Sequence, residues 1–413
     1  MKRGEERILR IRAALQERDL DALVCTLPAN VLLLSGYWPV VGAAVAAATR
    51  AGRVALLVPE DERDLAERGW ATDMRVFQPG SLARLTSPAE AVREPLATLL
   101  RDLGVAGGRI AYEAGDAYEP STYAAMHLYG PAAATGLGRA APGATLVPGA
   151  MPLSRLRAAM TAEEVERVRL GGAIAAGAFA EGARTIRSGR RESAVAAAYQ
   201  ALLCTHALDH DDIGRAGAFT YCMSGPNAAL AGAAYARTRA RELRAGDLVL
   251  IHCNSYIDGY WTDITRTYCL GEPDERQRAM YAAVFEARTA ALAAIRPGAR
   301  GKDVDRAARD VLTARGFGRQ FTHGLGHNVG FSAISTEFPP RLHPVSDDLL
   351  EVGMTFNVEP AIYIEGYGGL RHCDVVTLGA GGAEVLTDFQ NTAEQLILPD
   401  QAGPVFRENI TDA

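Results

Sequence analysis

The stretch "LVLIHCNSYIDGYWTDITRTY", residues 248–268, decides how the second half of this chain is interpreted. It begins with four consecutive apolar residues, as a short buried strand does, and continues through the turn-like sequence "IDGY". His252 and Asp263 lie eleven residues apart on the two sides of that turn. Because two polar side chains held in this way could share a metal ion, the stretch predicts a candidate metal site whose first position is a histidine.

Length and composition limit the class of protein. A chain of 413 residues exceeds what one hydrophobic core usually serves, so we expect two domains. The net charge of -6 and the lack of a long basic run argue against nucleic-acid binding. Six scattered cysteines without a C-x-x-C pair favour reduced thiols and a cytoplasmic location. No segment has the pattern of a membrane span or a signal peptide, so we expect no membrane partner.

The patterning along the chain indicates where one domain ends. Helix and strand patterns alternate over the first 150 residues, which is typical of an α/β domain. A Pro- and Gly-rich segment at 140–155 precedes a long helical pattern, in which Thr161 and Glu164 could form a capping box. We therefore place the boundary at Ser154, with domains at 1–154 and 155–413. The second domain mixes helices with strands, and the predicted fold class is α+β.

Three motifs of the second domain carry reactive groups. "HGLGHNVG" places His323 and His327 four residues apart among glycines, which suits a metal or a proton transfer but also a simple glycine-rich turn. Glu359 lies in the apolar strand "GMTFNVEPAIYI", where a carboxylate is costly to bury unless it is paired or metal-bound, although an exposed edge strand would also accommodate it. "GGLRHCDVV" brings Arg371 and its neighbours to the start of another strand, where a surface turn with a salt bridge is the alternative.

The order of these motifs resembles the pita-bread (M24) metallopeptidase family, in the branch of Xaa-Pro aminopeptidases, prolidases and creatinase. The resemblance covers nearly the whole chain. It rests on landmarks that occur in the family's order, namely "LDALVCTLPANVLLLSGY", "SGPNAAL", "GDLVLI", "DGYWTDITRTY", "RPG", "HGLGHNVG", "GMTFNVEPAIY" and "GGLRHCDVV". It implies a pita-bread catalytic domain preceded by a creatinase-type N-terminal α/β domain.

Transferred one residue at a time, the resemblance is incomplete at the metal site. The active peptidases bind two metal ions through two aspartates, one histidine and two glutamates. Asp263 matches the second aspartate, His327 the histidine and Glu359 the first glutamate. His252 stands where the family has its first aspartate, and Cys373 stands where it has its last glutamate.

Two histidines outside the family's metal shell are also replaced. Gly232 stands at one of their positions, and Ile334, seven residues after His327, stands at the other. In the peptidases these histidines hold the substrate carbonyl and carry protons, which glycine and isoleucine cannot do. His323 matches a substrate-side histidine of the aminopeptidase P branch and is retained. We therefore expect no efficient cleavage of Xaa-Pro bonds.

The changed ligands also affect the expected number of metal ions. In the family, one ion is held mainly by the residues matching Asp263, His327 and Glu359, while the other needs the first aspartate and the two bridging carboxylates. Adjacent divalent ions repel and need several negative ligands. We expect one divalent ion per chain, Fe, Zn or Mn, with His252 or Cys373 closing the ligand shell.

These considerations lead to one leading hypothesis and three alternatives. The leading hypothesis is a diverged metal-dependent enzyme that acts on a small polar, amino-acid-like substrate by C–N hydrolysis or by related lyase or oxidative chemistry. The alternatives are an Xaa-Pro aminopeptidase- or prolidase-like metallopeptidase with one metal, a metal-free hydrolase like creatinase, and a non-catalytic binding protein. The resemblance also implies a homodimer and a small-molecule or dipeptide-like substrate. The catalytic candidates are His252, His323, Arg371 and His372.

Overall fold

The computed structural model describes residues 3–79, 87–114, 124–126, 131–234, 237–335 and 337–400. They form two compact units: Met1–Glu164 with Glu337–Pro339, and Val165–Thr336 with Pro340–Ala413. The first unit includes Glu164, whose carboxylate accepts a 2.9 Å hydrogen bond from Nε of the buried Arg7. The predicted capping box is present: Thr161 N donates to Glu164 Oε2 at 2.7 Å, and Glu164 N donates to Thr161 Oγ1 at 3.3 Å.

The first unit is built on a mixed sheet with strand order β5-β4-β3-β1-β6-β8, beside a separate β2–β7 pair. Apolar residues of α4 and α5 pack on the strands and form its core. Its elements are α1 (Glu5–Glu17), β1 (Ala22–Cys25), α2 (Pro28–Ser35), β2 (Val41–Ala43), β3 (Val45–Thr49), β4 (Val54–Pro59), η1 (Glu60–Glu62), α3 (Arg63–Ala66), β5 (Asp73–Phe77), α4 (Pro88–Asp102), β6 (Arg109–Tyr112), β7 (Ala124–Met126), α5 (Pro131–Ala140), β8 (Thr145–Pro148) and α6 (Ala150–Ala158).

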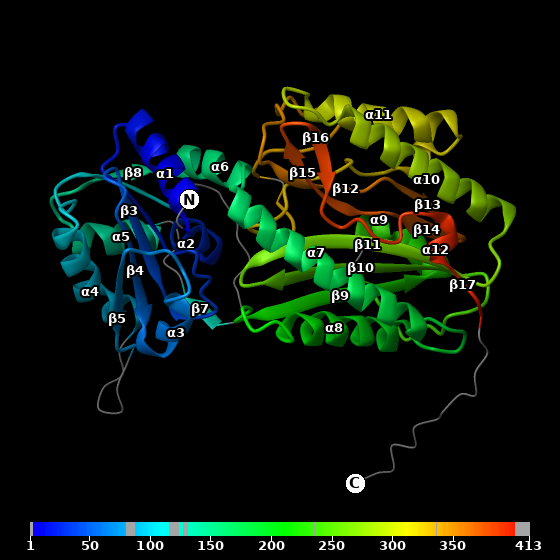
Figure 1. The fold of residues 1–413 in the computed structure, drawn as a ribbon, viewed down its shortest axis with the longest axis horizontal. Helices are drawn as coiled ribbons and strands as arrows, with labels where there is room; N and C mark the ends of the chain where they lie inside the picture. The colour runs from blue at the N-terminus through cyan, green and yellow to red at the C-terminus, as the bar shows by residue number, and fades with distance from the viewer. Residues whose placement is uncertain are drawn as a thin grey trace, which may run out of the picture. The chain divides into compact units, whose positions relative to one another are not determined.

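The second unit contains a four-stranded sheet of order β17-β11-β10-β9, a β12-β15-β16 sheet and a β13–β14 pair. In Figure 1, α7 and α8 run along the four-stranded sheet, and α10 and α11 lie beside the smaller sheets. The elements are α7 (Ala162–Gly182), η2 (Ala183–Thr185), α8 (Glu192–Leu208), β9 (Ala216–Ser224), η3 (Gly225–Leu230), α9 (Ala231–Ala234), β10 (Leu248–Ile257), β11 (Tyr260–Leu270), α10 (Glu275–Ala294), α11 (Gly301–Ala314), η4 (Gly318–Gln320), β12 (Thr355–Val358), β13 (Ala361–Ile364), β14 (Gly368–Arg371), β15 (Asp374–Gly379), β16 (Gly382–Val385), α12 (Ala393–Leu396) and β17 (Ile397–Leu398).

The stretch at 248–268 forms the hairpin β10–β11. Its turn is made by Asp258 at φ 47° and Gly259 at φ 86°, the left-handed conformations that tight hairpins require. The antiparallel register places His252 opposite Thr265, and Asn254 opposite Asp263. Because side chains alternate between the two faces of a strand, these four residues project from the same face of the sheet.

A buried ion pair joins this hairpin to β15. Arg266 and Asp374 are both fully buried, and Arg266 Nη2 donates to Asp374 Oδ1 at 2.7 Å. The same Nη2 also donates to Thr387 O at 2.8 Å, while Nη1 donates to Cys373 O at 2.7 Å and Nε to Phe389 O at 3.0 Å. Arg288 Nε donates to the other Asp374 oxygen at 2.6 Å. Arg266 of β11 therefore connects this hairpin to β15 and to the segment at Thr387.

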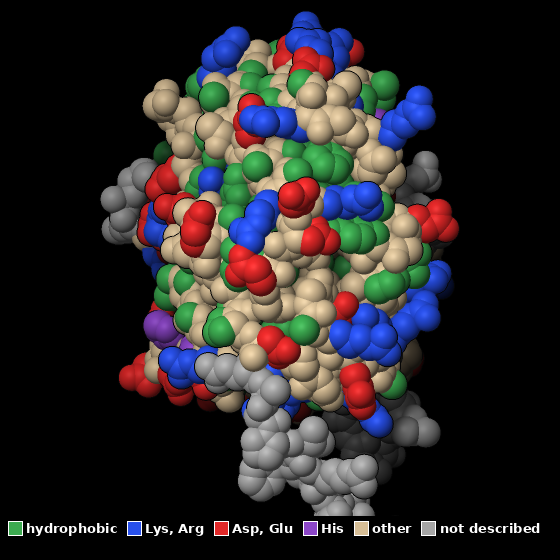
Figure 2. Space-filling view, turned by 90° about the vertical axis from the view of Figure 1, so that its right-hand side faces the viewer, with side chains coloured by type: hydrophobic (Ala, Val, Ile, Leu, Met, Phe, Trp, Pro, Cys, Tyr) green, Lys and Arg blue, Asp and Glu red, His purple; other side chains and the backbone are tan. Residues whose placement is uncertain are grey.

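The surface shows interleaved charges. On the face in Figure 2, acidic and basic side chains alternate with apolar ones among the described atoms.

None of the helices among the described residues combines the length and the apolar character that crossing a membrane requires.

Replacing Asp374 by asparagine is expected to destabilise the protein strongly. Burial alone would raise the pKa of Asp374, but Arg266, His372 and Arg288 hold it well below its usual value. The ion pair therefore stabilises the fold above the ordinary pKa of aspartate, and this stabilisation is lost as pH falls through the lower folded-state pKa. Asp374→Asn should lower the free energy of unfolding by about 3–5 kcal/mol, measured by urea denaturation at pH 7.

Asp303→Asn is the matched control, since Asp303 pairs with Arg306 on the exposed surface of α11. It should change the free energy of unfolding by less than about 1 kcal/mol. Equal effects of the two substitutions would contradict the role given to the buried pair.

Candidate active site

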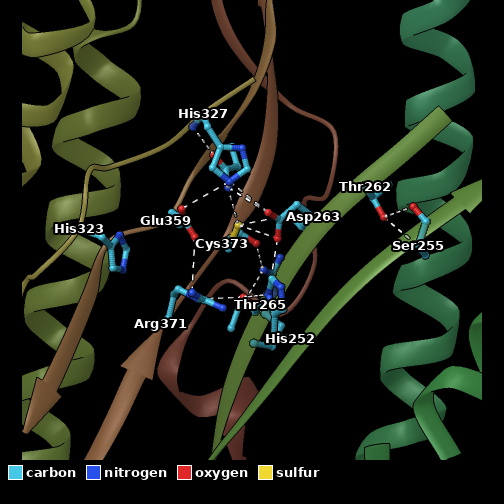
Figure 3. Close-up of polar contacts among 12 residues, drawn as sticks. His252, Ser255, Thr262, Asp263, Thr265, His323, His327, Glu359, Arg371 and Cys373 are labelled. Carbon is cyan, nitrogen blue, oxygen red and sulfur yellow. Dashed lines mark hydrogen bonds and ion pairs between the residues drawn. The ribbon is translucent and has the colours of Figure 1, made fainter. Parts of the chain in front are cut away.

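A cavity of about 320 Å³ opens in the second unit beside the β10–β11 hairpin. Its walls bring together most of the side chains that the sequence singled out (Figure 3). The described lining residues are Ala231, Gly232, His252, Asp263, His323, Gly324, Gly326, His327, Ile334, Arg341, His343, Glu359 and Arg371. The volume is at the lower end of the range for ligand pockets, which suits a small molecule.

Three of the predicted metal ligands face one another. His327 Nε2 lies 3.4 Å from Asp263 Oδ2 and 3.9 Å from Glu359 Oε1. The other ring nitrogen, Nδ1, lies 3.1 Å from the carbonyl oxygen of Asn328 and donates to it. That contact fixes the tautomer in which Nε2 carries a lone pair directed at the two carboxylates.

The loop that carries both histidines is held by α11. Asp305 is buried, and its Oδ1 accepts a 3.0 Å hydrogen bond from Leu325 N. Arg309, one helical turn further on, pairs with Asp305 and donates to His323 O at 2.9 Å. On the other side, Gly326 packs so closely on β12 that an added Cβ would lie 2.0 Å from the Asn357 carbonyl oxygen. Only glycine fits there, which explains the second glycine of "HGLGH".

Asn357 lies at the centre of the candidate ligands. Its Oδ1 accepts a 2.6 Å hydrogen bond from His327 N, and its Nδ2 lies 3.1 Å from His327 Nε2 and 3.3 Å from Asp263 Oδ2. The amide therefore donates to the same imidazole lone pair that a metal ion would use. Binding of an ion requires this amide to move aside.

The two substituted ligand positions carry neutral groups. Burial, together with the nearby Arg371, lowers the pKa of His252 well below its usual value, so the imidazole is uncharged at neutral pH. Burial, reinforced by Asp263, raises the pKa of the Cys373 thiol well above its usual value. The thiol lies behind the cavity wall, where Sγ is 3.2 Å from the Asp263 carbonyl oxygen and 3.8 Å from Oδ1. Neither group supplies the negative charge of the carboxylate it replaces.

The separations around His327 are close to those of ligands that share an ion. Two ligands of one tetrahedral ion with bonds of about 2.1 Å lie roughly 3.4 Å apart, close to the separations measured around His327. As the side chains stand, no group of three or more His, Cys, Asp and Glu residues within the described ranges is arranged to hold an ion. The amide of Asn357, which is in contact with His327 and Asp263, is the group that must move. Asp263, His327 and Glu359 could then hold a single ion.

His372, which the sequence predicts to be catalytic, is not among the described residues that line the cavity. It is buried against Phe285, with ring centroids 5.0 Å apart, and its Nε2 lies 3.4 Å from Asp374 Oδ2. Burial and the neighbouring Arg266 lower its pKa to about 4. The reason is the alternation of an extended chain, which directs residue 372 away from the side that Arg371 and Cys373 share. Arg371, by contrast, lines the cavity as expected.

His323 also lines the cavity, and it pairs with a tyrosine. Its Nδ1 donates to Gly324 O at 2.8 Å, so its Nε2 accepts from the Tyr363 hydroxyl at 3.1 Å. Burial lowers the pKa of His323, which leaves the ring neutral and able to accept a proton. The pair is positioned to receive or return a proton at the cavity wall.

Neighbouring side chains fill the space around Gly232 in the cavity wall. A Cβ added at that position would lie 2.8 Å from both Thr322 Oγ1 and Tyr363 Cδ2, so a histidine does not fit without rearrangement. Ile334 lines the wall with 39% of its surface exposed and offers no hydrogen-bonding group. The two outer histidines of the family therefore have no counterpart at these positions.

The sequence reasoning missed several residues of the site. Thr265 and Asn357 each lie two positions from a predicted ligand, Asp263 and Glu359 respectively, and a two-residue period would have identified them. Arg341 and His343 line the cavity from an irregular loop, for which the sequence has no periodic signal.

Comparisons with known proteins agree with this architecture. The model of metallopeptidase family M24 matches residues 166–380, and that of the creatinase/prolidase N-terminal domain matches residues 7–159. An Xaa-Pro dipeptidase of Pyrococcus furiosus is 34% identical over 232 residues, which cover 56% of this chain and 64% of that protein. An Xaa-Pro dipeptidase of Lactobacillus helveticus is 35% identical over 54% of this chain and 59% of that protein. The chain thus spans less than two thirds of the length of these relatives.

Solved structures share the whole fold. A dipeptidase from Pyrococcus horikoshii OT3 has a TM-score of 0.73 at 28% identity and covers 95% of this chain and 99% of its own. The X-Pro aminopeptidase from Thermotoga maritima MSB8 has a TM-score of 0.76 at 21% identity and covers 94% of this chain and 99% of its own. The predicted α+β pita-bread fold with a creatinase-type N-terminal domain is confirmed. The chain belongs to metallopeptidase family M24.

Proposed function

We propose that this chain is a diverged M24 enzyme that holds one divalent ion, Fe, Zn or Mn, through Asp263, His327 and Glu359. Its substrate is a small polar, amino-acid-like molecule, and it cleaves proline dipeptides poorly. The observation that carries the proposal is the pair of neutral groups, His252 and Cys373, at positions where the family's two-metal site has carboxylates.

Electrostatic repulsion between two divalent ions favours the binding of one ion over the binding of two. Two divalent ions about 3.5 Å apart repel by roughly 20 kcal/mol at an effective dielectric constant of about 20. Four carboxylates offset this repulsion in the family, whereas here only Asp263 and Glu359 are in place, with the cationic Arg371 beside them. One divalent ion balances the two carboxylates, and a second has no counter-charge.

The residues of this chain suit activation of a small substrate. A divalent ion held by the three ligands would supply Lewis-acid activation of the substrate and of water. His323 and Tyr363 form a hydrogen-bonded pair at the cavity wall that can move a proton to or from the reacting group. The described outer wall at Gly232 and Ile334 lacks the groups with which the peptidases hold a substrate carbonyl.

The named relatives favour one second candidate, a dipeptidase with a single ion. They are Xaa-Pro dipeptidases at 34% and 35% identity. The closed wall at Gly232 counts against it, since the carbonyl-binding histidine is missing and its space is filled. Efficient hydrolysis of an Xaa-Pro dipeptide by the manganese-loaded chain would select this candidate over the proposal.

Metal analysis of the purified chain is expected to give about one ion per chain. His327→Gln should abolish this binding, because it removes the imidazole that faces both carboxylates. His372→Gln is the matched control, and it should leave the metal content unchanged because His372 lies outside the cavity. Mass-spectrometric metal quantification after loading with Mn²⁺, Zn²⁺ or Fe²⁺ measures both. Loss of metal from both variants alike would contradict the assigned ligands.

Restoring the family's carboxylates is expected to restore the second ion. The double variant His252→Asp with Cys373→Glu should raise the metal content from about one to about two ions per chain, because it returns two negative charges to the site. Hydrolysis of Xaa-Pro dipeptides should remain at least about 100-fold below that of an active family member, since removing one group that stabilises the transition state commonly costs that much. A double variant that still holds one ion would show that the charge of the ligands does not limit the number of ions bound per chain.

A further inference from the structure

Arg371 is a buried cation whose hydrogen-bonding capacity is only partly used. It ends β14, is 5% exposed and lines the cavity. Its Nε donates to Thr265 Oγ1 at 3.1 Å, while Nη1 lies 3.8 Å from Glu359 Oε2, beyond hydrogen-bonding distance. Among the described residues, Nη2 has no hydrogen-bond partner. Since buried guanidinium donors are normally paired, this arginine is arranged to bind something that the chain itself does not provide.

The residue at position 252 explains why Arg371 Nη2 lacks a hydrogen-bond partner among the described residues. His252 Nδ1 and Arg371 Nε both contact Thr265 Oγ1, at 2.9 Å and 3.1 Å, so the imidazole lies beside the guanidinium. A carboxylate at position 252, as in the family, would bring a negative charge next to Arg371. Histidine brings none, and the arginine is left without that counter-charge.

The other groups around Arg371 do not supply the missing charge. Tyr363 and Cys373 are a phenol and a thiol, which are neutral at physiological pH. Asp263 and Glu359 are the only carboxylates close to it among the described residues lining the cavity, and in the proposed function both bind the metal ion. This step rests on that proposed function. With the ion in place, the guanidinium has no anion of its own.

We propose that Arg371, with His252 and Thr265 beside it, forms an oxyanion-binding subsite at this end of the cavity. The subsite takes a carboxylate or phosphate group of the substrate, while the reacting bond lies toward Asp263, His327 and Glu359. Guanidinium groups match the geometry of these anions through parallel N–H donors. The substrate is therefore a small molecule that carries an acidic group. In a cavity of about 320 Å³, the anionic group and the reacting bond lie within one small molecule.

Binding of simple anions tests the subsite without any assumption about the reaction. Isothermal titration calorimetry of the full chain as purified, without chelator, should show saturable binding of acetate or inorganic phosphate at one site per chain. Arg371→Gln should weaken that binding at least tenfold, and Arg371→Lys should weaken it less, because lysine keeps the charge without the planar donors. His252→Asp should also weaken it at least tenfold, because the new carboxylate pairs with Arg371.

Arg306→Gln is the control from outside the cavity. The Arg306 guanidinium pairs with Asp303 on the exposed surface of α11 at 2.8 Å, so anion affinity should change less than about threefold. Thermal unfolding of each variant identifies any that fail to fold, and Arg371→Lys and His252→Asp keep the test decisive if Arg371→Gln is one of them. Preference for acetate or for phosphate distinguishes a carboxylate substrate from a phosphate substrate.

Two outcomes would overturn the subsite: neither anion binds, or both bind equally well to the parent chain, Arg371→Lys and His252→Asp. Metal content measured on the same preparations separates this failure from failure of the proposed function. A chain that holds one ion but shows no Arg371-dependent anion binding refutes the subsite alone. A chain that shows Arg371-dependent anion binding but holds no metal supports the subsite and refutes the proposed metal centre.

Discussion

Charge balance in a buried cavity is the constraint on which this account depends. Asp263 and Glu359 lie in a largely buried cavity beside His327, and burial together with Glu359 raises the pKa of Asp263. Two carboxylates in such a place require positive charge nearby. One divalent ion provides it, and Arg371 adds a further positive charge. The same balance leaves no place for a second ion once positions 252 and 373 carry an imidazole and a thiol.

The contacts that hold the walls of the cavity do not depend on the residues at positions 252 and 373. The buried pair Arg266–Asp374 joins the β10–β11 hairpin to β15, and Asp305 with Arg309 holds the loop that carries His323 and His327. None of these contacts involves residue 252, and the Arg266 contact near residue 373 is to the backbone carbonyl oxygen. Substitutions at the two ligand positions can therefore alter the chemistry of the cavity while its walls keep their arrangement. Such separation is common, since one fold serves many functions through its sites.

Much of the fold and part of the site could be predicted from the sequence. The apolar runs, the turn at "IDGY" and the capping box at Thr161 are local signals, and the structure shows each of them. His372 was predicted to be catalytic, whereas the alternation of an extended chain directs its ring toward Phe285. Arg341 and His343 could not be predicted, because irregular loops place side chains through tertiary contacts alone. The partly unpaired state of Arg371 likewise depends on three-dimensional neighbours that are distant in sequence.

The number and position of bound ions test the central claim most directly. Crystals of the chain soaked in Mn²⁺ and measured at a wavelength where manganese scatters anomalously show each ion as a separate peak. The account predicts one peak, between Asp263, His327 and Glu359, with the Asn357 amide displaced from His327 Nε2 and no ion within bonding distance of His252. A second peak of similar height, bound by His252 and Cys373, would contradict it.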